Sequence, residues 1–175
     1  MKKEREAVQP EKDGPTILII DPEQNISEII QSGLRYDSLH VLSMVDEMEG
    51  IRLAQRIRPA LIITELPLSF IDGVELCRRL RNDQRTRDIP ILVISSDKQS
   101  QESILAAGAN DYLARPFAFD DLLQHILALL PREAVASLHI LPSRYNPMRR
   151  TRRSILDFLE EWTDQALENK LKLSD

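Results

Sequence analysis

The sequence predicts an α/β fold in which helices cover both faces of a five-stranded parallel sheet. Short apolar runs alternate along the chain with segments whose apolar residues recur at three- and four-residue spacing. These two patterns are typical of strands and helices, respectively. The apolar runs are continuous, as strands that are buried on both faces of a parallel sheet require. A strictly alternating order of strands and helices favours a doubly wound sheet.

The predicted strands are TILII (16–20), LHVLSM (39–44), ALIIT (60–64), PILVIS (90–95) and DYLA (111–114). The segments between and after them with helical periodicity are SEIIQSGL, EMEGIRLAQRIR, GVELCRRLR, ESILAAG and FDDLLQHILALL. In a sheet of this kind, functional side chains gather at the carboxyl ends of the strands, where the loops open a crevice. We therefore expect a functional site at these strand ends.

The composition indicates one ordinary domain with an appendage, because the chain has 175 residues and single domains cluster at roughly 100 to 150. Its hydrophobic content of 42% allows a real core, and its formal net charge of -5 gives no argument for nucleic-acid binding. Residues 1–14 mix charges with proline and glycine, so we expect a disordered tail. The lone Cys77 is expected to be a small buried hydrophobe. No apolar stretch approaches a membrane span, and we expect a cytoplasmic protein without membrane contact.

The residues at the predicted strand ends are Asp21, Pro22, Glu23, Glu65, Ser95, Ser96, Arg115 and Pro116. With the segment GANDYLARPF, and with PALIITELPLSFIDG placing Glu65 before a closing Asp-Gly, this set resembles the bacterial response-regulator receiver family over residues 15–131. The resemblance implies a receiver or flavodoxin-like sheet and a role in two-component signal transduction or a phosphorelay.

The chain departs from this family at the positions that carry its chemistry. In a working receiver an aspartate attacks phosphorus, Mg²⁺ neutralises charge, and a lysine and a hydroxyl hold the phosphoryl oxygens. Here Glu65 replaces the aspartate and extends the carboxylate by roughly 1.5 Å, and a misplacement of about 1 Å can cost on the order of 100-fold in rate. Pro22 replaces a metal ligand, which leaves Asp21, Glu23 and Glu65 as weak candidates. We expect a pseudo-receiver with no catalytic residue, no enzymatic activity, no Mg²⁺ and no other cofactor.

Arg115 stands where the family has lysine, and arginine pairs well with carboxylates. We expect an ion pair between Arg115 and Glu65 that resembles the activated state, with less charge than a phosphate carries. The alternative is a decayed site of solvated loop residues. Pro116 resembles the family's cis-proline, although an ordinary trans-proline is the alternative.

Ser95 and Tyr112 resemble the hydroxyl and the aromatic that move together in receiver switching, although Tyr112 could equally be a half-buried strand aromatic. Between Ser95 and Gly108 the chain is about two residues shorter than the family pattern. This predicts a trimmed fourth helix and an altered partner specificity.

The C-terminal part is predicted to be a linker over 132–145, with about one helical turn, and an amphipathic helix over 146–175 that begins at Asn146-Pro147. Arginines cluster near its start, at Arg144, Arg149, Arg150, Arg152 and Arg153. Because cations oppose the dipole there, they indicate an anionic partner or, equally, a solvated basic turn. An apolar stripe comprises Met148, Ile155, Leu159, Trp162 and Ala166. The stripe predicts packing on a second copy of the chain, which we slightly favour, or on its own domain.

These observations predict an atypical response-regulator-like protein that acts by phosphorylation-independent contact with other signalling proteins. Two other classes stay open. One is a true phosphoacceptor with unconventional chemistry that uses Asp21 or a nearby group. The other is a nucleic-acid-binding regulator that uses Arg149, Arg150, Arg152 and Arg153, although we do not expect nucleic acid as a partner, since no recognisable binding module accompanies them.

Overall fold

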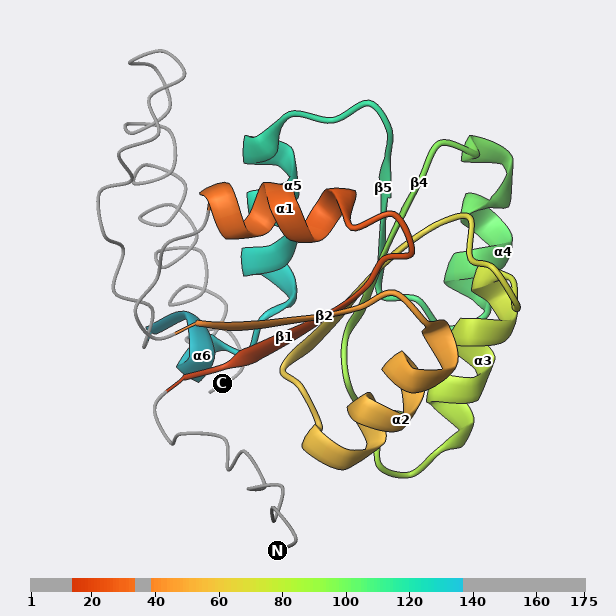
Figure 1. The fold of residues 1–175 in the computed structure, drawn as a ribbon, viewed down its shortest axis with the longest axis horizontal. Coiled ribbons are helices and arrows are strands. Elements are labelled where there is room, and N and C mark those ends of the chain that lie inside the picture. Colours follow the sequence, from red (N-terminus) through yellow and green to blue (C-terminus); the bar gives the residue numbers. More distant parts are fainter. Residues whose placement is uncertain (1–13, 34–38, 137–175) are drawn as a thin grey trace, which may run out of the picture.

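The computed structural model describes residues 14–33 and 39–136 (Figure 1). Its strands are β1 (Thr16–Ile20), β2 (His40–Met44), β3 (Leu61–Glu65), β4 (Ile91–Ser95) and β5 (Asp111–Ala114). They form one sheet in the order β2-β1-β3-β4-β5, and every neighbouring pair is parallel. The predicted five-stranded parallel sheet is therefore confirmed.

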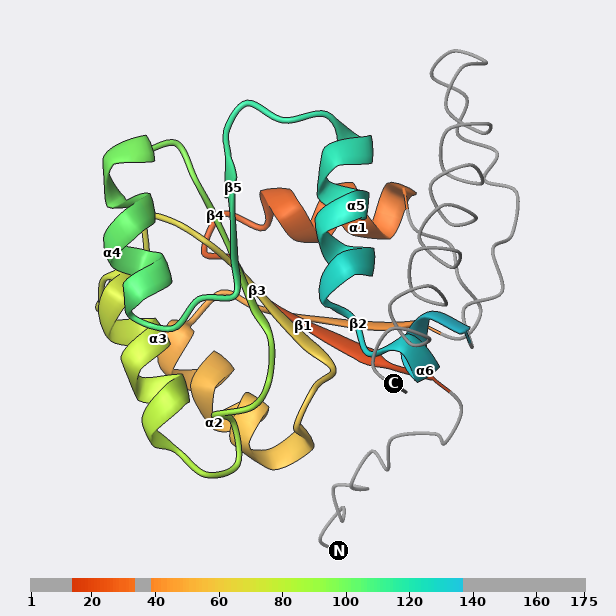
Figure 2. The same cartoon turned by 180° about the vertical axis from the view of Figure 1, so that it is seen from behind.

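The helices are α1 (Asn25–Gly33), α2 (Glu47–Ile57), α3 (Gly73–Asn82), α4 (Gln101–Ala106), α5 (Phe119–Leu129) and α6 (Arg132–Ala136), with a 3-10 turn η1 (Lys98–Ser100) before α4. Helices α1 and α5 cover one face of the sheet, and α2, α3 and α4 cover the other (Figure 1). The view from behind shows the same three layers (Figure 2). The fold is thus doubly wound, as the sequence predicts.

Two apolar clusters hold these layers together. Successive strand residues point to opposite faces, so Ile17 and Ile19 pack toward α1 and α5 while Leu18 and Ile20 pack toward α2 and α3. All four side chains are fully buried, which explains why the apolar run of β1 is continuous. Cys77 lies in the second cluster, and burial raises the pKa of its thiol to about 11. The expectation of a buried structural cysteine is confirmed.

Aspartates fix the starts of the helical segments near the carboxyl edge of the sheet. Asp46 accepts the Glu49 amide at the start of α2 at 2.8 Å, and Asp72 caps α3 in the same way. Asp97 accepts the Gln99 amide at the start of η1 at 3.0 Å. Helix α4 has six residues; the trimming of the fourth helix relative to the family stays a prediction.

Helix α6 lies within the predicted linker, for which about one helical turn is expected. Residues 1–13 of the predicted 1–14 tail and the rest of the predicted linker lie outside the described residues. The predicted C-terminal helix, with its arginine cluster and apolar stripe, also lies outside them. Within residues 14–33 and 39–136, none of the helices combines the length and the apolar character needed to cross a bilayer.

Candidate functional site

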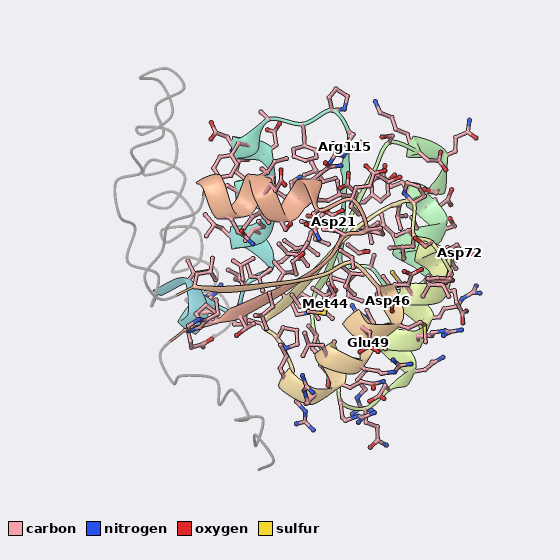
Figure 3. All side chains as sticks on the ribbon, in the orientation of Figure 1. Asp21, Met44, Asp46, Glu49, Asp72 and Arg115 are labelled. Carbon is pink, nitrogen blue, oxygen red and sulfur yellow. The ribbon has the colours of Figure 1, made fainter. Side chains whose placement is uncertain are left out.

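The predicted site residues meet at one edge of the sheet because the strands that carry them run parallel side by side. Asp21 follows β1, Glu65 and Ser95 are the last residues of β3 and β4, and Arg115 follows β5. The Arg115 amide donates to the Ser95 carbonyl at 2.9 Å, which extends the pairing of β4 and β5 beyond the strands. Figure 3 shows Asp21 and Arg115 near one another at this edge. The structure thus brings the strand-end residues together as predicted.

Glu65 and Arg115 form a close ion pair between Oε1 of the glutamate and Nη2 of the arginine. Glu65 is only 8% exposed. The Arg115 guanidinium also lies over the Phe117 ring, 5.4 Å from its centroid, a position in which a cation is attracted to an aromatic face. The Arg115–Pro116 peptide bond is cis. Both the predicted ion pair and the predicted cis-proline are therefore present.

Burial raises the pKa of Glu65 to about 7, because the charged carboxylate is poorly solvated at this position. The cation of Arg115 acts in the opposite direction, whereas the negative charges of Asp21 and Glu23 raise the pKa further. Oε2 of Glu65 is buried without a hydrogen-bond partner among the described residues. Glu65 is consequently near the midpoint of its titration at neutral pH, and its negative charge grows as the pH rises.

Asp21 shapes the turn between β1 and α1. Its side chain is fully buried, and its two oxygens accept the backbone amides of Glu23 at 3.0 Å and Ile26 at 2.7 Å. Glu23 is exposed and accepts the side-chain amide of Asn25 at 2.8 Å. The geometry assigns Asp21 a structural task at the start of α1, which the sequence pattern did not predict.

These side chains do not fit the magnesium site that the family resemblance implies. Mg²⁺ requires near-octahedral oxygen ligands, and Pro22 offers no side-chain oxygen. Both Asp21 oxygens already bind backbone amides. Nowhere in the described part of the chain are three or more His, Cys, Asp or Glu side chains arranged to hold a metal ion.

Ser95 and Tyr112 are both buried and both bind the backbone of Asp97. The Asp97 amide donates to Ser95 Oγ at 3.1 Å, and the Tyr112 hydroxyl donates to the Asp97 carbonyl at 2.5 Å. Tyr112 is only 6% exposed, so its ring is packed inward and its hydroxyl is satisfied. The two residues singled out as switch-like therefore act on the same loop, between β4 and α4.

Sequence reasoning missed Glu47, a fully buried residue in the first turn of α2. Its Oε1 accepts the backbone amides of Phe70 and of Ile71, the latter at 3.3 Å. Glu47 thereby fastens the loop between β3 and α3. No local signal could have identified it, because an acid beside the N-cap Asp46 is what an ordinary helix start contains.

A family model for the response regulator receiver domain matches residues 17–127. The DNA-binding dual master transcriptional regulator RpaA of Synechocystis sp. is 40% identical over 120 residues, which are 67% of this chain and 50% of that protein. The response regulator MprA of Mycobacterium leprae is 35% identical over 118 residues, which are 66% of this chain and 51% of that protein. The chain thus spans about half the length of the curated relatives it matches.

Solved receiver structures share the fold. A two-component response regulator from Clostridium difficile is similar with a TM-score of 0.60 and 28% identity, covering 68% of this chain and 98% of its own. The receiver domain of the sensor histidine kinase PA1611 from Pseudomonas aeruginosa PAO1, solved with a magnesium ion coordinated in its active site cleft, is similar with a TM-score of 0.57 and 27% identity, covering 66% of this chain and 97% of its own. With the family match and the sheet order described above, these similarities show that the chain belongs to the response regulator receiver family of two-component signalling.

Proposed function

We propose that this chain is a pseudo-receiver, which signals by contact with other signalling proteins and neither accepts a phosphoryl group in its pocket nor needs Mg²⁺. The observation that carries this proposal is Glu65, buried at the end of β3 and paired with Arg115. The ion pair lies at the strand end where the family carries its phosphoacceptor aspartate. A phosphoryl donor would have to separate the pair before it could reach the carboxylate.

The geometry of the acceptor supports the same proposal. The extra methylene of glutamate moves its carboxylate by roughly 1.5 Å relative to aspartate, and in-line attack tolerates errors of this size poorly. Asp21 is an inferior replacement as a nucleophile, because both of its oxygens accept backbone amides. The lack of a side-chain oxygen at Pro22 supports the absence of a metal requirement.

The ion pair offers a substitute for the phosphorylated state. It places a negative charge against the cation that follows β5, while Tyr112 is packed inward on Asp97. Since the pKa of Glu65 is about 7, this substitute gains charge as the pH rises through neutrality. We therefore expect the protein to contact its partner without a kinase, and most strongly above pH 7.

The test is to incubate the full chain with acetyl phosphate and Mg²⁺ and to measure its intact mass, with a phosphorylatable receiver treated in parallel. The expected result is no gain of mass in this chain and a gain of one phosphoryl group in the parallel sample. A phosphoryl group on this chain would overturn the proposal. If fragmentation then placed it on Asp21, the protein would be an unconventional phosphoacceptor.

DNA binding is a second candidate function. The relative from Synechocystis is named as a DNA-binding regulator, so our expectation that nucleic acid is not a partner finds no support among the relatives. In this chain the residues that would carry such binding are Arg149, Arg150, Arg152 and Arg153. Binding to generic duplex DNA that weakens steeply with salt would support this candidate, and no binding at low salt would exclude it.

A further inference from the structure

The loops β3–α3 and β4–α4 enclose a groove of about 700 Å³ at the carboxyl edge of the sheet. Its apolar lining comprises Leu66, Pro67, Leu68, Ile71, Val74 and Ile104. The charged side chains that line it, Asp72 and Asp97, are both acidic. Phe70 stands in the lining with 76% of its surface exposed. A groove of this volume is large enough to take up several side chains of a partner.

Phe70 is held in this exposed position by buried groups. Glu47, which is fully buried, accepts the backbone amides of Phe70 and Ile71. At the start of the loop the Leu66 amide donates to the Ile94 carbonyl at 2.8 Å. Burial of a carboxylate costs free energy unless the group is well paired. The two amide contacts of Glu47 offset this cost and hold the loop in the conformation that exposes the Phe70 ring. Fixed, exposed aromatic side chains beside a groove are typical anchors of interfaces.

We propose that this groove binds the C-terminal segment of the chain, residues 146–170. The sequence predicts that this segment carries an apolar helical stripe with Ile155, Leu159 and Trp162, preceded by Arg149, Arg150, Arg152 and Arg153. The apolar stripe suits the apolar lining of the groove. The positive charges of the arginines complement the negative charges of Asp72 and Asp97. The proposal is independent of whether the pocket around Glu65 accepts phosphate.

The chain is long enough for this contact. The described residues end at Ala136 in α6. Helix α6 lies beside the start of β1, at the opposite end of the sheet from the loops β3–α3 and β4–α4 (Figure 1), which line the groove. The ten residues that lead from there to Asn146 can span roughly 33–36 Å when extended. A domain of about 120 residues is roughly 35 Å wide. The segment can therefore reach the groove of its own domain.

Trp162 is the single tryptophan of the chain, so its fluorescence reports directly on the segment. In the full chain we expect blue-shifted emission and protection from acrylamide quenching. Phe70→Ser should shift the emission to that of a solvated indole and remove the protection. Ser69→Arg, at an exposed position of the lining, should do the same by repelling the arginines. Val45→Ser is the matched control, since Val45 is an exposed apolar side chain, 49% exposed, outside the groove.

Three results would overturn the proposal. The first is solvated emission from Trp162 in the unmodified chain. The second is protection that survives both Phe70→Ser and Ser69→Arg, which would place the stripe on another surface. The third is protection that grows with protein concentration, together with a dimeric mass, and that is unchanged by either variant, which would show that the stripes of two copies pack on one another. Far-UV circular dichroism confirms that each variant is folded.

Discussion

The buried carboxylate of Glu65 should make the stability of this domain depend on pH near neutrality. Its pKa rises from an ordinary 4.5 to about 7 on folding, and each pKa unit corresponds to about 1.36 kcal/mol. The difference between these two pKa values therefore corresponds to roughly 3 kcal/mol.

The direction of the pH dependence of stability follows from which protonation form of Glu65 the folded state favours. A folded pKa above the unfolded one means that folding favours the protonated carboxyl. The contribution to stability is thus complete below pH 4.5 and is lost as the pH rises through 7. Glu65→Gln carries no titrating group, so the free energy of unfolding of the unmodified protein should fall relative to this variant by about 2–3 kcal/mol between pH 5 and 8.

Urea unfolding at half-unit pH intervals measures this difference. Arg115→Gln provides a directional check, because Arg115 lowers the pKa of Glu65, and its loss should move the midpoint of the pH dependence above 7. Ser96→Ala, at an exposed neutral position of the same edge, should follow the unmodified protein. A difference between the unmodified protein and Glu65→Gln that stays constant from pH 5 to 8 would refute the assignment of a poorly solvated carboxylate.

Three further predictions concern the site and its surroundings. Glu65→Asp alone should remain unphosphorylated by acetyl phosphate with Mg²⁺, whereas Glu65→Asp combined with Pro22→Asp should gain mass; equal labelling of the two would show that the missing ligand is unimportant. Tyr112→Phe removes the hydrogen bond to the Asp97 carbonyl and should lower the free energy of unfolding by about 1 kcal/mol, and an unchanged urea midpoint would contradict this. Gly108→Ala adds a side chain at φ +110° and should cost about 1–3 kcal/mol, visible as a lower melting temperature; an unaltered melting curve would show that the turn relaxes.

The strands were predictable because burial on both sheet faces leaves a continuous apolar run in the sequence. The predicted bounds of β1 and β5 are those observed. The third strand was predicted to end at Thr64, where the apolar run ends, but Glu65 still pairs with Ile94 in the ladder. Hydropathy could not reveal this, because the Glu65 side chain is accommodated by its contact with Arg115.

The sequence predicted those parts of the candidate site that follow from the order and direction of the strands. Parallel strands bring Glu65 and Arg115 to the same edge, and their opposite charges then predict the ion pair. The hydrogen bonds that Asp21 accepts depend on the path of the β1–α1 turn. The contact of Glu47 with the Phe70 amide joins residues that are 23 positions apart in the sequence. Neither leaves a periodic pattern in the sequence, since both arise from loop conformation.

The peptide groups of Asp97 link Ser95 and Tyr112 in a way that constrains how the domain can respond to a partner. Each hydroxyl binds a different backbone group of the same residue, one the amide and one the carbonyl. A movement of the β4–α4 loop that breaks one bond therefore shifts the partner of the other. The energetic effects of Ser95→Ala and Tyr112→Phe should consequently be non-additive in a double-mutant cycle, so that the end of β4 and the ring on β5 behave as one cooperative unit.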